Sequence, residues 1–304
     1  MISRVSTSTL NRTMLDASMR IQAQVATVQE QISSGLKAGS YADLGGGIVE
    51  RTLSLESAMS RSQSITDGIA TASARGEMMY AGVGDMIDML TTLRSNLSAA
   101  STGAGTDAEQ IPVVAEGLLE DMEQAMNLRY EGRYLFAGSN TTEAPVDVSA
   151  LAVPTIPSVA DTSYYGGGTG AQTVRLSEDL TISYGANAED DAFETTLRAL
   201  NIAANLTTSP LDEDAVAEAY ELATSAIDAL TAIQSGLSNA VSRMETAQAG
   251  EETTQAFLSE TFSDLTAVDV AEATVQLSQY QTQLEASYAS ISKVMSTRLM
   301  DYLL

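Results

Sequence analysis

Residues 270–295 read VAEATVQLSQYQTQLEASYASISKVM. Four apolar residues recur here every seven positions: Val270, Leu277, Leu284 and Ile291. Beside them lie Ala273, Tyr280, Tyr288 and Met295. A repeat of this kind keeps a narrow apolar stripe on one face of a helix, where it can pack along another helix. The stretch therefore predicts a C-terminal helix that needs a helical partner.

The N-terminal end carries a matching stripe whose steps are three or four residues. It comprises Leu10, Met14, Ala17, Ile21, Val25, Val28 and Ile32. Neither end has a compact core of its own, so the partner is either the other end of the chain or a neighbouring subunit. The residues that we predict to pack subunits together are Leu10, Met14, Ile21, Val25, Val28, Ile32, Val270, Leu277, Tyr280, Leu284, Ile291 and Met295. Paired end helices indicate a building block rather than an enzyme.

The composition narrows the possible chemistry. The chain has 304 residues, 44% of them hydrophobic, and aromatic residues make up only 5%. This composition suits long helices with thin interfaces. The chain has neither Cys nor His, which removes disulfides, thiolate nucleophiles, imidazole bases and the usual zinc ligands.

The net charge of −25 argues against binding to nucleic acid or to anionic lipid. The charge is uneven, because residues 1–40 sum to +2, residues 265–304 to −2 and residues 41–264 to −25. Near-neutral ends could pack together while the acidic middle stays in water. The acidity could equally serve solubility alone.

Acidic runs occur at residues 190–191, 212–214 and 251–252, but chance runs are expected in so acidic a chain. The run at residues 166–170, GGGTG, lacks the Gly-Lys-Ser/Thr ending of a phosphate loop and predicts a turn. We therefore expect no catalytic site, no cofactor and no metal. Residues 1–25 show no signal-peptide pattern, and no apolar run approaches the ~18 residues of a membrane span, so we expect no membrane insertion.

Along the chain, periodicity predicts helices at 3–35 and 49–100, with a turn at 45–47 and a break at 103–106. A third helix is expected from about 107–112 through Tyr130, with Gly138 as a helix stop. Residues 144–188 hold three Pro, a glycine run and short alternating segments at 173–176 and 180–184, which predict a small β-rich insert. Helix returns at 191–206. Ser209 and Pro210 signal the start of helix that continues to the C-terminus, with possible interruptions at Gly236, Gly250 and Thr266.

The expected fold class is mainly α: an elongated antiparallel helical rod or bundle formed by the N- and C-terminal regions, with a small central β-rich insert. Three domains are expected. Residues 1–40 with 265–304 form terminal coiled-coil helices, residues 41–143 with 190–264 a helical rod, and residues 144–189 the insert.

Four segments resemble those of a known family. Residues 6–37 are similar to the N-terminal signature of bacterial flagellins and their hook-associated relatives, and residues 90–97 to the conserved helical segment that comes next in those chains. Residues 264–304 are similar to the family's C-terminal pattern. Residues 130–141, YEGRYLFAGSNT, resemble the Gly-x-Tyr-Leu-Phe-Ala-Gly motif of the hook–filament junction proteins, whereas flagellins carry an Asn-rich sequence there. The motif residues are Gly132, Tyr134, Leu135, Phe136 and Gly138. The family's Asp-Asp-Pro turn is replaced by SYADLG at residues 40–45.

The resemblance implies a structural axial protein of the bacterial flagellum, exported through the type III apparatus without a cleaved signal peptide. It implies self-assembly as a homo-oligomeric ring between a neighbouring hook-associated junction protein and flagellin, with help from an export chaperone. The paired ends would line the inner tube and the insert would face outward. The alternatives are a flagellin, which forms long filaments alone, and a cytosolic coiled-coil adaptor or chaperone, which stays unsecreted.

Overall fold

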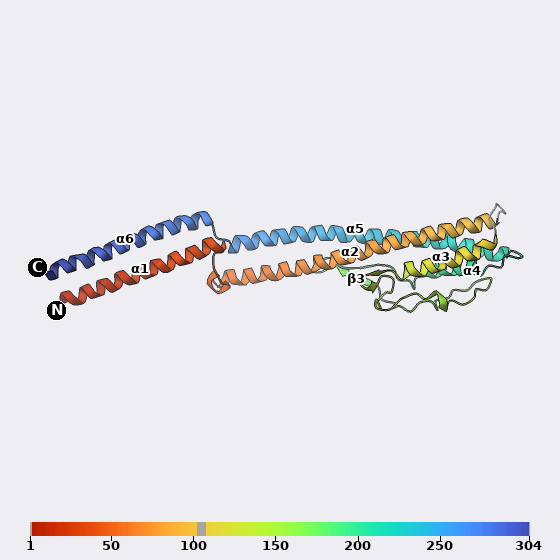
Figure 1. Cartoon of the computed structure of the whole chain (residues 1–304), viewed down its shortest axis with the longest axis horizontal. Helices are drawn as coiled ribbons and strands as arrows, with labels where there is room; N and C mark the ends of the chain where they lie inside the picture. The colour runs from red at the N-terminus through yellow and green to blue at the C-terminus, as the bar shows by residue number, and fades with distance from the viewer. Residues whose placement is uncertain (1, 102–107, 304) are drawn as a thin grey trace. The chain divides into compact units, whose positions relative to one another are not determined.

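The computed structural model describes residues 2–101 and 108–303, and side chains within residues 9–294 apart from Asn11. In this part of the chain the fold is mainly helical, with two small antiparallel two-stranded sheets, β1–β2 and β3–β4 (Figure 1). The elements are α1 (Ile2–Ser34), η1 (Tyr41–Leu44), α2 (Gly46–Ser101), η2 (Ala108–Gln110), α3 (Ile111–Met126), β1 (Arg129–Tyr130), β2 (Arg133–Tyr134), η3 (Val148–Ala150), β3 (Gln172–Arg175), β4 (Thr181–Tyr184), α4 (Asp191–Ala204), α5 (Glu213–Thr266) and α6 (Val270–Leu303). The predicted mainly-α class with a small β-rich part is confirmed.

The chain divides into two compact units. The terminal unit comprises Met1–Arg61 and Gln255–Leu304, and the central unit comprises Ser62–Thr254. Helices α2 and α5 each contribute residues to both units.

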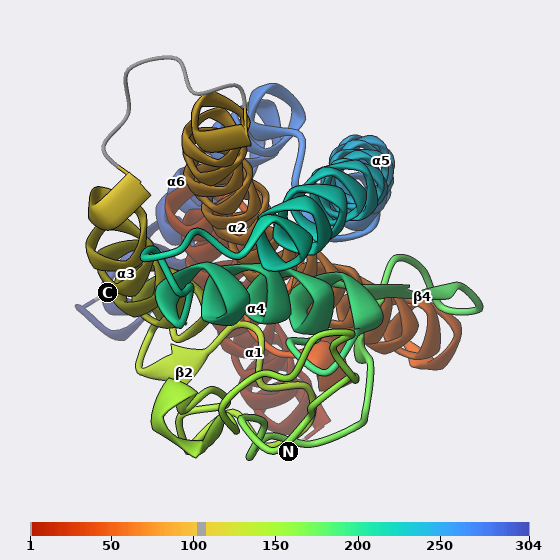
Figure 2. The ribbon, with the colours of Figure 1, turned by 90° about the vertical axis from the view of Figure 1, so that its right-hand side faces the viewer.

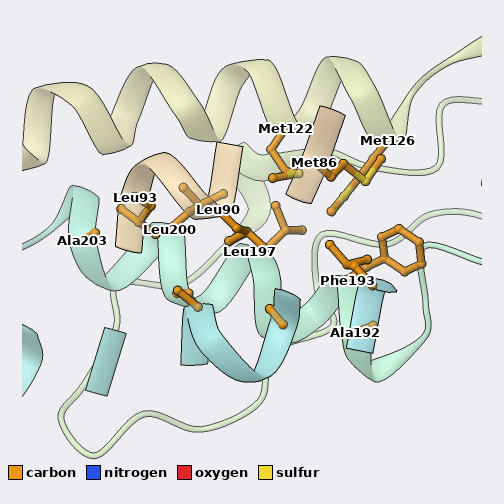
Figure 3. Close-up of a cluster of buried hydrophobic side chains, with 14 of the residues drawn as sticks. Met86, Leu90, Leu93, Met122, Met126, Ala192, Phe193, Leu197, Leu200 and Ala203 are labelled. Carbon is orange, nitrogen blue, oxygen red and sulfur yellow. The ribbon is translucent and has the colours of Figure 1, made fainter. Parts of the chain in front are cut away.

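The central unit has a closed apolar core where α2, α3, α4 and α5 lie side by side (Figure 2). Helix α3 begins with Pro in its first turn, a position where the missing N–H costs no hydrogen bond. Its apolar residues recur at helical spacing and face α4 and α2. The close-up in Figure 3 shows Met86, Leu90 and Leu93 of α2, Met122 and Met126 of α3, and Phe193, Leu197 and Leu200 of α4. All eight are at most 1% exposed.

A second core cluster lies under the β3–β4 hairpin. The antiparallel register pairs Val174 with Ile182, so alternate side chains point to the same face. That face, which also holds Leu176 and Tyr184, packs on Ile69 and its apolar neighbours on α2 and α5. The two predicted strands of the insert are therefore confirmed.

The terminal unit is built differently. Helices α1 and α6 pack against each other (Figure 1), yet the only buried hydrophobic side chains among its described residues are Val28 and Ala273. The predicted interruption at Thr266 is confirmed, because α5 ends there. Helix α6 begins four residues later, at Val270, with Asp269 as its cap, whose Oδ1 accepts the backbone N–H groups of Ala271 and Glu272 at 2.9 and 3.2 Å.

The prediction for the end of the third helix is wrong. Helix α3 ends at Met126, and the chain turns into the β1–β2 hairpin instead of continuing through Tyr130. The reason is a long-range contact: the Asn127 side chain donates to the Val146 carbonyl at 2.8 Å and accepts the Val146 N–H at 3.1 Å. Gly138 consequently ends no helix.

The predicted start of α5 and the predicted interruptions at Gly236 and Gly250 are also wrong. Helix α5 begins at Glu213, not at Ser209–Pro210, and its cap is Asp212, whose Oδ1 accepts the Ala215 N–H at 3.0 Å. Gly236 and Gly250 do not interrupt α5. No other group lies within 4 Å of a Cβ placed on either glycine, so each costs only its helix propensity, which burial of the opposite face offsets. The break predicted at 103–106 lies outside the described residues.

Candidate assembly surface

The terminal pair is the two helices α1 and α6. Polar contacts join them: the hydroxyls of Ser18 and Ser287 lie 2.7 Å apart, and the Gln22 amide donates to the Tyr288 hydroxyl. These contacts fix which faces of the two helices meet. The partner of each end helix within the chain is therefore the other end of the same chain.

The residues predicted from the sequence to pack subunits together fall into three groups. Val28 is buried, and most of the others are half-buried in or beside the seam of the terminal pair: Met14, Ile21, Val25, Ile32, Leu277, Tyr280, Leu284 and Ile291. Leu10 and Val270 are 46% and 48% exposed. The side chain of Met295 lies outside the described residues. The role of these residues between subunits stays a prediction.

A second apolar set, which the sequence reasoning missed, lies outside the seam. Leu15 and Met19 of α1 are 54% and 51% exposed, and Val275 of α6 is 68% exposed. The signal was present, because Leu15 and Met19 are one turn apart and widen the apolar face beyond what one helix partner can cover. Such exposed apolar side chains on a thinly packed pair suit contact with further copies of the chain.

The segment that follows α1 lies against the segment that joins α5 to α6, and we call these two segments the crossings of the chain. Residues 35–37 and 266–268 form an antiparallel bridge, in which the Lys37 N–H donates to the Thr266 carbonyl at 2.7 Å and the Val268 N–H donates to the Gly35 carbonyl at 2.9 Å. The SYADLG segment that replaces the family's turn forms η1, and the Ser40 hydroxyl donates to the Asp43 carboxylate at 2.7 Å. Beside the bridge, a hollow of about 360 Å³ is lined by Leu36, Ala38, Gly39, Ser40, Tyr41, Leu44, Phe262 and Thr266.

The family motif builds a corner of the central unit. Its first part is the two-residue turn between β1 and β2, where Glu131 and Gly132 both have positive φ, 49° and 77°. Two positive φ values are the signature of a hairpin turn that matches strand twist, and glycine adopts them at least cost. The Arg129 guanidinium lies 4.0 Å from the centre of the Tyr134 ring, a cation–π contact that steadies the hairpin.

The second part of the motif enters the core. Phe136 is fully buried, and its ring centre lies 5.6 Å from that of Phe193 on α4. Gly138 has φ +58°, and a Cβ placed on it would lie 1.9 Å from the carbonyl oxygen of Gly168. Gly138 therefore serves as the point where the motif and the glycine run of the insert touch backbone to backbone, a contact that sequence spacing cannot show.

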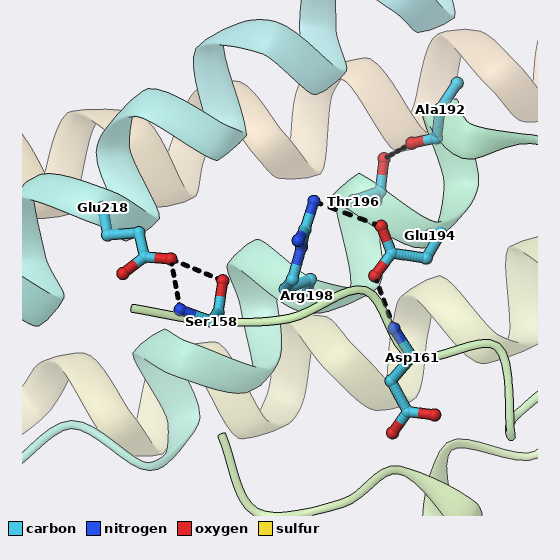
Figure 4. Close-up of polar contacts among 7 residues, drawn as sticks. All are labelled: Ser158, Asp161, Ala192, Glu194, Thr196, Arg198 and Glu218. Carbon is cyan, nitrogen blue, oxygen red and sulfur yellow. Dashed lines mark hydrogen bonds and ion pairs between the residues drawn. The ribbon is translucent and has the colours of Figure 1, made fainter. Parts of the chain in front are cut away.

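Carboxylates hold the insert against the helices (Figure 4). Glu218 of α5 accepts hydrogen bonds from the backbone N–H and hydroxyl of Ser158, the former at 2.7 Å. Glu194 of α4 accepts the Asp161 N–H at 3.0 Å and pairs with Arg198 at 3.3 Å. The pKa of Asp161 is lowered, because its carboxylate accepts the Ala152 N–H and hydrogen bonds from Ser163. The carboxylates of Glu218, Glu194 and Asp161 thus accept hydrogen bonds from backbone N–H groups and hold these groups in place, rather than interacting with one another.

Each of the three acidic runs considered as catalytic candidates contains a residue with a structural partner. Asp190 accepts the Asn187 N–H at 3.2 Å, Asp212 caps α5, and Glu251 accepts the Ser62 hydroxyl at 2.5 Å. Within the described ranges, no three Asp or Glu residues gather as a metal site. No helix in the described part of the chain is both long and apolar enough to cross a membrane.

Comparison with known families identifies both ends of the chain. The model of the bacterial flagellin N-terminal helical region matches residues 5–141, and that of the C-terminal helical region matches residues 220–303. Together these matches span more than half of the chain. The chain belongs to the flagellin-like family.

Solved structures share the fold of this flagellin-like chain. A putative flagellar hook-associated protein from Vibrio parahaemolyticus is 13% identical with a TM-score of 0.59, and the match covers 74% of this chain and 100% of that one. FlgL from Bacillus cereus is 16% identical with a TM-score of 0.51, over 71% and 98% of the two chains. The hook-associated protein-3 from Legionella pneumophila is 12% identical with a TM-score of 0.56, over 69% and 98%. No curated protein matches the chain.

Proposed function

We propose that this chain is a structural axial protein of the bacterial flagellum that joins the hook to the filament by self-assembly. The observation that carries the proposal is the terminal pair: two family-matched end helices whose described residues include only two buried hydrophobic side chains, and which leave Leu15, Met19 and Val275 exposed. A helix pair of this kind gains most of its burial from neighbouring subunits.

The junction role, rather than that of a filament subunit, is supported by the corner at residues 132–138. Its sequence resembles the motif of hook–filament junction proteins, and it packs as one unit with α4 and the insert. The fold that the chain shares with solved hook-associated proteins agrees with this choice. A flagellin remains the second candidate because the family models of both ends describe flagellin regions.

In the proposed assembly, copies of the chain form a ring between a second hook-associated protein and flagellin. Residues 1–40 and 265–304 form the polymer core, residues 41–143 and 190–264 the rod, and residues 144–189 an outward insert. The chain reaches this place through type III export, aided by a chaperone. Its role is structural, with no catalytic step.

A deletion strain tests the junction role, with electron microscopy of the cell surface and a blot for flagellin in the medium. The proposal predicts bare hooks with flagellin monomers released into the medium, because filament subunits are exported with nothing on which to nucleate. Bare hooks without released flagellin would make this chain the filament subunit. Normal filaments would remove it from the flagellar axis.

Complementation of that strain with two matched variants tests the surface. Val275 on the terminal pair and Val159 on the insert are both highly exposed valines, at 68% and 77%. Val275→Asp should fail to restore filaments, because in the proposed assembly it places a charge on a surface that packs against a neighbouring subunit. Val159→Asp should restore them. Equal restoration by both variants would contradict the assignment of the surface.

A further inference from the structure

The bridge between residues 35–37 and 266–268 contains one cationic side chain with an unusual set of partners. The Lys37 ammonium donates to the backbone carbonyls of Asp264 and Leu265 at 2.7 and 3.1 Å. These carbonyls belong to the last turn of α5, where no further helical N–H follows to satisfy them. The C-terminal end of a helix carries a partial negative charge, so an ammonium group at this point stabilises it.

The backbone of Lys37 also forms hydrogen bonds, one with α5 and one with α1. The backbone N–H of Lys37 donates to the Thr266 carbonyl at 2.7 Å, and its carbonyl accepts the Gln31 side-chain amide at 2.6 Å. Gly35, with φ +72°, turns the chain out of α1 so that Lys37 can reach α5. Lys37 therefore contacts the end of α1 and the end of α5 at once, through both its backbone and its side chain.

We propose that residues 35–37 and 266–268 form a latch, fastened by the Lys37 ammonium, that holds the two crossings of the chain in register. Without the ammonium, the last carbonyls of α5 turn to water, and only two backbone hydrogen bonds hold the crossings together. With it, residues 31–37 and residues 264–268 move as one body. On the proposed function, this latch sets the terminal pair in one arrangement for assembly.

Hydrogen–deuterium exchange of the full-length monomer tests the latch directly, because the N–H groups of residues 37 and 268 are its two backbone donors. Lys37→Met removes the charge and keeps the length of the side chain. We expect the amides of residues 37 and 268 to exchange about tenfold faster or more, since a charge-assisted hydrogen bond is lost. The Ala188 amide, which donates to the Phe136 carbonyl at 2.9 Å within the central unit, should be unchanged and reports that the variant is folded.

Lys293→Met is the matched control, because the chain has only two lysines and the second lies on α6. It removes the same charge and should leave exchange at residues 37 and 268 within twofold of the wild type. Exchange at these two amides that is equal in the wild type and in Lys37→Met would overturn the latch. The measurement uses the monomer, so its outcome does not depend on whether the chain forms the hook–filament junction.

Discussion

The central unit and the terminal unit are both built from long helices that lie side by side, but they differ in how many side chains they bury and in their charge. The central unit buries a continuous core of Met, Leu and Phe, whereas the described part of the terminal unit buries only two hydrophobic side chains. Their charges differ too: the central unit has 7 basic and 29 acidic residues, and the terminal unit has 8 and 11. The central unit closes its core within the chain and has a net charge of −22, whereas the terminal unit has a net charge of −3 and leaves apolar side chains exposed. Exposed apolar side chains on a nearly neutral unit suit contact with a partner.

The largest effect is expected in the central core. Phe193→Ala removes a fully buried ring that contacts Phe136, and it should lower the free energy of unfolding by about 3–5 kcal/mol. Denaturant unfolding followed by near-UV absorption of the buried tyrosines measures it. A loss below about 1 kcal/mol would show that the core of the central unit is not closed as described.

A pair of glycine variants sharpens the assignment of the motif corner. Gly132→Ala should cost about 1–2 kcal/mol for its left-handed backbone alone, because nothing lies within 4 Å of the new Cβ. Gly138→Ala adds the collision with the Gly168 carbonyl and should cost about 1–3 kcal/mol more. Urea denaturation compares the two variants. Equal losses would mean that the contact between Gly138 and Gly168 contributes nothing.

Two aspartate variants separate the seam of the terminal pair from its outer face. Leu284 is half-buried and Val275 is exposed. Leu284→Asp should open the pair in the monomer, at a cost of about 1–3 kcal/mol, and should also abolish assembly. Val275→Asp should leave the monomer unchanged and block assembly alone. Helix content by circular dichroism and seeded polymerisation read the two effects, and normal assembly of Leu284→Asp would show that the wrong face was chosen.

The smallest effect concerns alkaline pH. Burial raises the pKa of Tyr164 above its usual 10.0, and that of Tyr165 to about 12. The unfolded chain loses these protons near pH 10 and the folded chain does not, so stability is unaffected below pH 10 and falls as the pH rises toward 12. Tyr165→Phe should make this fall shallower in urea titrations between pH 9 and 12. An unchanged slope would contradict the burial of this hydroxyl.

The sequence predicted the features that depend on local pattern. The bounds of α1, α2 and α4 agree within a few residues, and the predicted break at Thr266 is where α5 ends. The β1–β2 hairpin was missed although a two-residue Glu-Gly turn between two Arg-Tyr pairs is a recognisable hairpin signal. The bonds from Asn127 to Val146 and the contact of Gly138 with Gly168 join residues 19 to 30 positions apart, which no periodicity reports.

For the assembly surface, the sequence identified the apolar stripes, but not which apolar residues are covered by the other end helix and which stay exposed. Leu284 and Ile291 of the seven-residue pattern are half-buried, but the pattern cannot tell whether its apolar side meets α1 or another subunit. The exposed set was missed because Leu15, Met19 and Val275 lie off the repeat. Lys37 gave no signal at all, since its partners are backbone carbonyls more than 220 residues away.

Limited trypsin digestion of the full-length monomer tests the central claim, that the terminal pair is weakly held until it has neighbours. Arg12 and Arg20 of α1 and Arg243 of α5 are all helical and exposed, so they differ mainly in the unit to which they belong. The account predicts rapid cleavage after Arg12 and Arg20 with Arg243 intact, and protection of the first two sites on assembly. Cleavage of all three at the same rate in the monomer would contradict it.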